Sequence, residues 1–292
     1  MSIITITNGS LSASVNTAGG AFHSIVMNGI EYLWQGDAKY WKSRDYILFP
    51  YVGRFTDGGY TYKGQKYLMN THGFARGKEF EVTALSESSV TLTLTESEDT
   101  LACFPFRFRM DITYTVSGSR VSKTISVTNT GDDEMYFGLG GHPGFNIPIN
   151  GEGEFTDWCA EFPGTGSPSR IFFNYESYRL SGVEEPYPLE DGCRLPLQHC
   201  LFDNDAIVLK DMPRAVTLRS DASEHSVTVS FPETPFVGLW HAVKTDAPYV
   251  CIEPWVSLPS HHDYVEDFEK QPDLVHLEAG ETYLNNLYID IK

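Results

Sequence analysis

Apolar and polar residues alternate along much of the chain with a period of two, which is typical of β-strands that bury one face. The alternation is clearest over residues 90–94, 108–116 and 121–127, and it returns over residues 283–291. A helical period of 3.6 residues is not found over any long segment. The pattern therefore predicts an all-β protein.

Two-residue turn signals join the predicted strands into hairpins. Asn28-Gly29, Lys63-Gly64 and Ser117-Gly118 each stand between two alternating segments, and glycine adopts the backbone conformations that such tight turns need. Strands that follow one another through short turns pair antiparallel. We therefore expect a large antiparallel β-sandwich of two sheets.

The chain has 292 residues, a length that admits one domain or two fused half-sandwiches. The alternation loosens after residue 146 and returns near residue 216, with a Gly- and Pro-rich stretch between them. No internal repeat indicates a propeller or a solenoid. We expect residues 1–292 to form a single domain.

Charge and composition narrow the possible partners. The 21 basic and 39 acidic side chains give a formal net charge of −18, which repels both a nucleic-acid backbone and an anionic membrane surface. The five cysteines form no C-x-x-C pair and predict neither a zinc site nor a disulfide framework. The N-terminus reads as a strand rather than a signal peptide, and no apolar stretch is long enough to span a membrane. We therefore expect a cytoplasmic protein without nucleic-acid or membrane partners.

Four short segments interrupt the strand pattern with polar residues. They are FPYVGRF with Arg54, NTHGFAR with His72 and Arg76, GGHPGF with His142, and VCIEPW with Glu253. Polar groups in apolar or Gly- and Pro-rich surroundings are candidates for a site, although each is also compatible with a purely structural role.

Glu253 follows a buried strand, and Pro254 prevents the regular continuation of that strand. Partial burial raises the pKa of a carboxyl group and suits it to proton transfer near neutral pH. A structural ion pair with an arginine such as Arg54 is the alternative explanation. His142 stands among glycines and a proline, which predict a strand end that presents the imidazole; a histidine satisfied in a tight turn is the alternative.

A metal site is not expected. His261, His262 and Asp263 carry ligand groups, but adjacent residues of a strand point to opposite faces. The chain has no phosphate-binding loop of the P-loop type and no G-x-S-x-G nucleophile motif.

In their order along the chain, these segments resemble the aldose 1-epimerase (galactose mutarotase) family. The closest likeness is to the mutarotase-related branch, in which HPGF stands where typical mutarotases have a His-x-Tyr-Phe-Asn motif. The resemblance runs from GGAFHSIVMNGIEYLW through GRFTDGGYTYKGQKY and HGFAR to IEPW and LEAGETY. It implies a galactose mutarotase-like β-sandwich with a sugar cleft on one sheet, and an isomerase that needs no cofactor.

The resemblance also implies roles for residues. Glu253 matches the general base that takes the proton of the anomeric hydroxyl, and His142 matches the general acid that protonates the ring oxygen. Arg54 and His72 match positions that hydrogen-bond the sugar hydroxyls. A further sugar-binding aspartate falls in LFDNDAIVLK, where both Asp203 and Asp205 match and Asp205 aligns better with the apolar strand that follows. An aromatic ring for the apolar face of the sugar is expected from Trp240 or Trp255.

The identity of the sugar stays open. HGFAR also resembles the matching segment of glucose-6-phosphate 1-epimerases, in which arginines gather the sugar phosphate, and Arg76 suits that role. A non-catalytic carbohydrate-binding protein is a third alternative, although the presence of both His142 and Glu253 favours an enzyme. We rank a free hexose first and a hexose phosphate second. The sequence does not indicate the oligomeric state.

Overall fold

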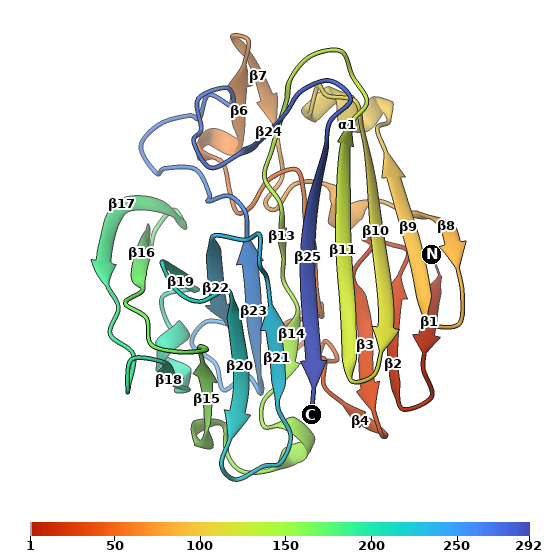
Figure 1. The fold of residues 1–292 in the computed structure, drawn as a ribbon. Helices are drawn as coiled ribbons and strands as arrows, with labels where there is room; N and C mark the ends of the chain where they lie inside the picture. Colours follow the sequence, from red (N-terminus) through yellow and green to blue (C-terminus); the bar gives the residue numbers. More distant parts are fainter. Residues whose placement is uncertain (1) are drawn as a thin grey trace.

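The computed structural model describes residues 2–292, and strands dominate it (Figure 1). The larger sheet has nine strands, and all its neighbouring strands run antiparallel. Their order across the sheet is β18 (Arg194–Pro196), β15 (Trp158–Glu161), β20 (Ala215–Ser220), β21 (Val227–Ser230), β25 (Thr282–Ile291), β11 (Arg120–Asn129), β10 (Phe108–Ser117), β9 (Ser89–Thr95) and β8 (Glu81–Leu85).

A second, eight-stranded sheet packs against part of the first. Its main path is β17 (Arg179–Pro186), β16 (Ser169–Asn174), β19 (Ile207–Lys210), β22 (Phe236–Trp240), β23 (Tyr249–Trp255), β13 (Gly140–Gly141) and β5 (Ile47–Leu48), while β14 (Gly144–Asn146) also pairs with β23. These pairings are antiparallel as well. The expected all-β antiparallel sandwich is confirmed.

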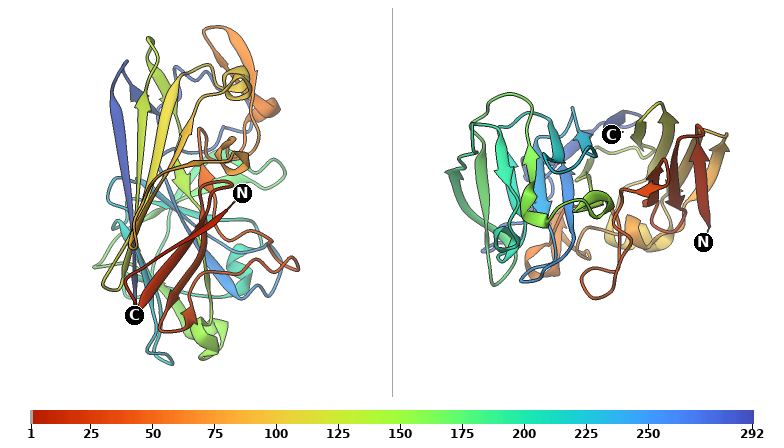
Figure 2. Two further views of the ribbon diagram at one scale, coloured as in Figure 1. Left: turned by 90° about the vertical axis from the view of Figure 1, so that its right-hand side faces the viewer. Right: turned by 90° about the horizontal axis from the view of Figure 1, so that it is seen from below.

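Smaller elements complete the layers. A four-stranded N-terminal sheet lies beside the β8–β11 end of the nine-stranded sheet (Figures 1 and 2). The small sheets and helices are β1 (Ile3–Thr7), β2 (Leu11–Asn16), β3 (Phe22–Met27) and β4 (Ile30–Glu31); the pairs β6 (Gly59–Tyr62) with β7 (Gln65–Leu68) and β12 (Met135–Phe137) with β24 (Val275–Leu277); the α-helix α1 (Glu98–Cys103); and 3₁₀ turns at Thr56–Gly58, Ala75–Gly77, Ile149–Gly151, Phe155–Asp157 and His199–Phe202. Among the helices of residues 2–292, none combines the length and the apolar character needed to cross a membrane.

The three predicted hairpins are present. Met27 pairs with Ile30, Tyr62 with Gln65 and Ser117 with Arg120 across their turns. Alternate residues of β10 and β11 are buried, as the sequence pattern predicts. The burial of these apolar faces between the layers stabilises the sandwich.

The alternation of apolar and polar residues did not predict the strands between residues 147 and 215. β18 has only three residues, and most of β17 is exposed. The pairing of β16 with β17 also shifts register between Ile171 and Phe173, and such a bulge breaks the alternation that marks a strand.

The two faces of β23 have different surroundings. Val250 and Ile252 pack in the main core between the sheets, whereas Cys251 and Trp255 belong to apolar clusters on the other face. Because successive side chains of a strand point to opposite faces, Glu253 shares the face of Cys251 and Trp255. This outer face of the eight-stranded sheet carries the cavity described next.

Candidate functional site

A cavity of about 370 Å³ lies at this face of the eight-stranded sheet. This volume falls in the range of small-molecule sites. All eight candidate residues predicted from the sequence line it: Arg54, His72, Arg76, His142, Asp205, Trp240, Glu253 and Trp255. Asp203, the alternative to Asp205, is not among the lining residues.

The backbone holds His142 opposite β23. Gly140 pairs with Trp255 and Gly144 pairs with Cys251, so β13 and β14 both lie against the same strand. His142 and Pro143 stand between them. The sequence predicted a strand end at this point; the structure shows an interruption instead, because the chain resumes pairing with the same neighbour after the proline.

Close packing explains the glycine two positions before His142. A Cβ atom on Gly140 would lie 3.0 Å from Trp255 Cδ1 and 3.1 Å from the carbonyl oxygen of Pro254. Any larger side chain would therefore push β13 away from β23.

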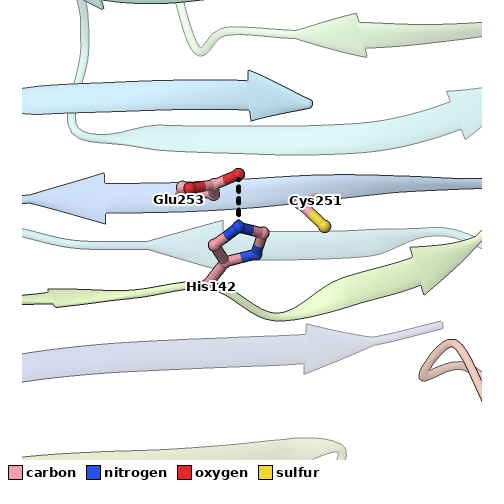
Figure 3. A group of neighbouring side chains, drawn as sticks. All are labelled: His142, Cys251 and Glu253. Atoms are coloured by element: carbon pink, nitrogen blue, oxygen red, sulfur yellow. Dashed lines mark ion pairs between the residues drawn. The ribbon is translucent and has the colours of Figure 1, made fainter. Parts of the chain in front are cut away.

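His142 and Glu253 form a buried pair. His142 Nε2 lies 3.1 Å from Glu253 Oε1, and only 9% and 2% of the two side chains are exposed (Figure 3). Glu253 has no ion pair with Arg54 among the described residues, so the structural alternative considered for this carboxyl does not hold. Neither His142 Nδ1 nor Glu253 Oε1 makes a hydrogen bond in residues 2–292, so Nε2 and Oε1 lie at ion-pair distance without hydrogen-bond geometry.

Burial favours the neutral form of each partner. It lowers the pKa of His142 to about 3, and the charge of Arg76 lowers that pKa as well. Burial raises the pKa of Glu253 well above its usual value, and the charge of Asp205 adds to the rise. Since either an imidazolium with a carboxylate or an imidazole with a carboxylic acid holds one proton, the pair can pass this proton without changing its net charge.

Aromatic rings surround His142 and explain its desolvation. Ring centroids of Trp41, Trp240 and Tyr46 lie 4.9, 5.5 and 5.8 Å from the imidazole centroid. Trp41 is tilted by only 31° from the imidazole plane, an arrangement that also stabilises an imidazolium when one forms.

The buried carboxylate of Asp45 holds the backbone of His142 in place. Asp45 Oδ1 accepts a hydrogen bond from the backbone N–H of His142, and Oδ2 accepts one from the N–H of Phe22, both at 3.1 Å. Lys123 reaches the same carboxylate from β11 of the nine-stranded sheet, with Nζ 3.9 Å from Oδ2. The backbone of the histidine is thus tied to a charged group inside the sandwich.

His72 is fixed as a hydrogen-bond donor. The N–H of Gly53 donates to His72 Nδ1 at 3.1 Å, so the proton of the neutral ring resides on Nε2. Burial holds the pKa of His72 well below its usual value, and the electrostatic effects of the neighbouring His142, Arg76 and Arg54 act in the same direction. Its φ of 63° is in the left-handed region, a costly conformation that is often found at functional sites.

Asp205 shares this backbone feature, with a φ of 78°. Burial raises the pKa of its carboxyl, while hydrogen bonding by Ala206 and the charge of Arg54 oppose the rise. The carboxyl therefore faces the cavity as an acceptor with a cation nearby.

The two cavity arginines lie over aromatic rings. Arg54 Cζ is 5.0 Å from the ring centroid of Tyr178, and Arg76 Cζ is 5.0 Å from that of Tyr46. Neither guanidinium has a carboxylate oxygen within 4.0 Å anywhere in residues 2–292, so both are available to a ligand.

Four lining aromatic residues were not predicted from the sequence: Trp41, Tyr46, Phe173 and Tyr178. The first two lie in a segment without strand alternation, KYWKSRDY, whose dense aromatic and basic residues were the available signal. The other two belong to the region where the strand pattern was weak.

Three donor groups come close enough to hold a metal. One ligand atom each of His142, Cys251 and Glu253 lies within 4.8 Å of the others (Figure 3), and residues 2–292 contain no second such group. Burial raises the pKa of Cys251 well above its usual value, which keeps the thiol protonated and disfavours coordination. The three candidate ligands at residues 261–263 do not form a group; His261 Nδ1 instead lies 3.2 Å from Glu266 Oε1.

Comparison with known proteins gives a consistent result. The model of the family described as Aldose 1-epimerase matches residues 2–289. Protein LacX, encoded on a plasmid of Lactococcus lactis subsp. lactis, is 31% identical over an alignment of 280 residues that covers 93% of each chain. A galactose mutarotase-like protein from Lactobacillus casei is 30% identical with a TM-score of 0.94 over the whole of both chains. A galactose mutarotase related enzyme from Lactobacillus acidophilus is 29% identical with a TM-score of 0.93, covering 100% of this chain and 97% of the other.

Proposed function

This chain belongs to the aldose 1-epimerase family of isomerases, and on that premise we propose that it interconverts the α and β anomers of a hexose by opening and closing the sugar ring. The observation that carries the proposal is the 3.1 Å separation of His142 Nε2 and Glu253 Oε1 within a cavity of hexose size. The anomeric hydroxyl and the ring oxygen are bonded to one carbon, so an acid and a base must act side by side.

In the proposed reaction, the Glu253 carboxylate takes the proton of the hydroxyl on C1 while the His142 imidazolium gives a proton to the ring oxygen. The C1–O5 bond breaks and C1 becomes an aldehyde carbon. Rotation about C1–C2 presents its other face, and the reverse transfers close the ring. The pair keeps one proton throughout; burial favours imidazole with carboxylic acid, and the starting imidazolium–carboxylate form arises when Glu253 passes its proton to His142.

The remaining cavity groups would hold the ring in place. We assign hydrogen bonds with sugar hydroxyls to His72 Nε2, Arg54 and Asp205. Trp240 and Trp255 would contact the apolar face of the ring. The presence of both Arg54 and Arg76 in the cavity supports a hexose phosphate as the second candidate substrate, because two guanidinium groups suit a phosphate.

Polarimetry tests the proposal. Freshly dissolved α-D-galactose and α-D-glucose are followed at neutral pH with wild type, Glu253→Gln and His142→Asn. Loss of either proton carrier should lower kcat by about 10²-fold or more. Glu185→Gln makes the same chemical change at an exposed position of β17 and should leave the rate unaltered. If wild type accelerates neither these sugars nor their 6-phosphates while still binding them, a non-catalytic carbohydrate-binding protein replaces the isomerase.

A further inference from the structure

A second cavity, of about 360 Å³, adjoins the first. Tyr46 and Arg76 line both cavities and so form the boundary between them. The contact between the Arg76 guanidinium and the Tyr46 ring lies at this boundary. The two cavities are therefore direct neighbours of similar size, separated by these two side chains.

Basic side chains line the second cavity. Lys42, Arg44 and Arg76 contribute three positive charges, and none of them has a carboxylate oxygen within 4.0 Å in the part of the chain that the structure describes. Other cations are paired: Lys39 Nζ lies 3.5 Å from Asp246 and Lys63 Nζ lies 3.0 Å from Asp133.

The carboxyl group that lines this cavity does not neutralise those charges. Asp45 is buried, and both of its oxygens already accept backbone hydrogen bonds from His142 and Phe22. The ammonium group of Lys123 lies 3.9 Å from it on the core side. Lys123, rather than a cation of the cavity, therefore balances the negative charge of Asp45.

Arg44 is held in place by a neutral neighbour. Its Nη1 lies 2.6 Å from His23 Nε2, and burial, together with the charge of Arg44, lowers the pKa of His23. The imidazole thus orients the guanidinium without cancelling its charge. A guanidinium binds phosphate oxygens in pairs, and a lysine adds a mobile point charge.

The basic lining contrasts with the rest of the molecule. The chain carries a formal net charge of −18, which repels anions at long range, so three unpaired cations around one concave space form a local exception. A ligand binds well here when its negative charge lies within reach of these three cations.

We propose that the second cavity binds the phosphate-bearing portion of a reducing saccharide whose anomeric centre lies beside the His142–Glu253 pair. The proposal rests on the proposed function for the placement of the reacting ring. It deepens that function by naming the substrate class: a phosphorylated saccharide long enough to extend from the first cavity past Tyr46.

The test compares maltose with maltose 6′-phosphate, whose phosphate is on the non-reacting ring. Wild type, Lys42→Met and Arg44→Met are assayed for binding by calorimetry and for mutarotation by polarimetry, with free glucose as the reference substrate. Each substitution should weaken binding of the phosphorylated disaccharide by about tenfold or more, the value of one charge-assisted hydrogen bond. Neither should alter glucose mutarotation more than twofold. Lys42→Arg keeps the charge and should keep the preference.

Lys39→Met is the matched control, because it removes the same charge from the same loop at a side chain that is 64% exposed and outside both cavities. The proposal is overturned if wild type binds maltose 6′-phosphate no better than maltose, or if Lys42→Met and Arg44→Met leave that preference intact. If binding depends on the phosphate but no sugar is turned over, the phosphate subsite stands and the isomerase function is rejected. The failure of this proposal and the failure of the proposed function are therefore distinguishable. Glucose 6-phosphate binding that is insensitive to Lys42→Met and Arg44→Met, with no preference for the longer phosphate ester, would place the phosphate in the first cavity and also overturn the proposal.

Discussion

Lys123 and Asp45 form a buried ion pair that links β11 of the nine-stranded sheet to the segment before β5, next to His142. Lys123 Nζ lies 3.9 Å from Asp45 Oδ2, and the side chains are 2% and 0% exposed. The ammonium group has no hydrogen-bond partner in residues 2–292. Burial lowers the pKa of Lys123, and the charge of Asp45 opposes that change. The Asp45 carboxylate therefore stabilises the charged form of Lys123 inside the core.

Lys123→Met should lower the free energy of unfolding by about 3–5 kcal/mol, because it leaves the Asp45 carboxylate buried without its counter-charge. Urea denaturation at pH 7 measures the loss. Adding Asp45→Asn should recover part of it, since the second change removes the orphaned charge. A loss below about 1 kcal/mol for Lys123→Met would show that the pair contributes little.

The proposed catalytic pair, His142 and Glu253, should act over a wide pH range. Ordinary pKa values of 4.5 for glutamate and 6.5 for histidine would confine the one-proton state to the interval between them. Here burial lowers the pKa of His142 to about 3 and raises that of Glu253, so the interval widens on both sides. We expect kcat/KM to stay level from below pH 4.5 to above pH 6.5. A narrow bell between those values would contradict the proposed proton sharing.

The same shifts predict opposite effects on stability. The folded pKa of Glu253 lies above its unfolded value, so wild type loses stability as pH rises above 4.5. The folded pKa of His142 lies below its unfolded value, so stability is lost as pH falls from 6.5 toward 3. Denaturation at a series of pH values should show Glu253→Gln becoming more stable relative to wild type as pH rises. His142→Asn should become more stable relative to wild type as pH falls. Parallel stability curves for all three proteins would exclude both shifts.

Trp41→Ala should expose His142 to water. The ring now lies 4.9 Å from the imidazole, and its removal should raise the pKa of His142 toward 6.5. We expect kcat/KM to fall by about tenfold, in line with the loss of one aromatic contact, while Trp41→Phe retains most of it. Nitrogen-15 NMR of labelled histidine reports the pKa. An unchanged pKa in Trp41→Ala would mean that other rings account for the desolvation.

Gly140→Ala should be destabilising by about 1–3 kcal/mol, because its Cβ has no room beside Trp255. Gly77→Ala offers a matched control, since nothing lies within 4 Å of the added methyl group. Thermal unfolding of the two variants gives the comparison. Equal midpoints would show that β13 can move away from β23 without loss.

The sequence was most informative where one face of a strand is buried. Alternation predicted β9, β10, β11 and β25, and the order of the motifs predicted which residues line the cavity. It could not place Trp41 or Tyr46, because a loop has no periodicity to show where its side chains point. Lys123 carried a signal, as a lysine in the inward register of β11 between Val121 and Ile125. Its partner, however, is 78 positions earlier in the chain, and only the folded sandwich brings Asp45 to it.

The interruption of pairing at His142 and Pro143 has a mechanical consequence. Since β13 and β14 are both hydrogen-bonded to β23, the proposed acid and base lie on neighbouring segments of one sheet. Domain closure is therefore unnecessary for their alignment. With the pair held in place by the sheet, changes in the loops at the cavity mouth would alter turnover through substrate entry and product release.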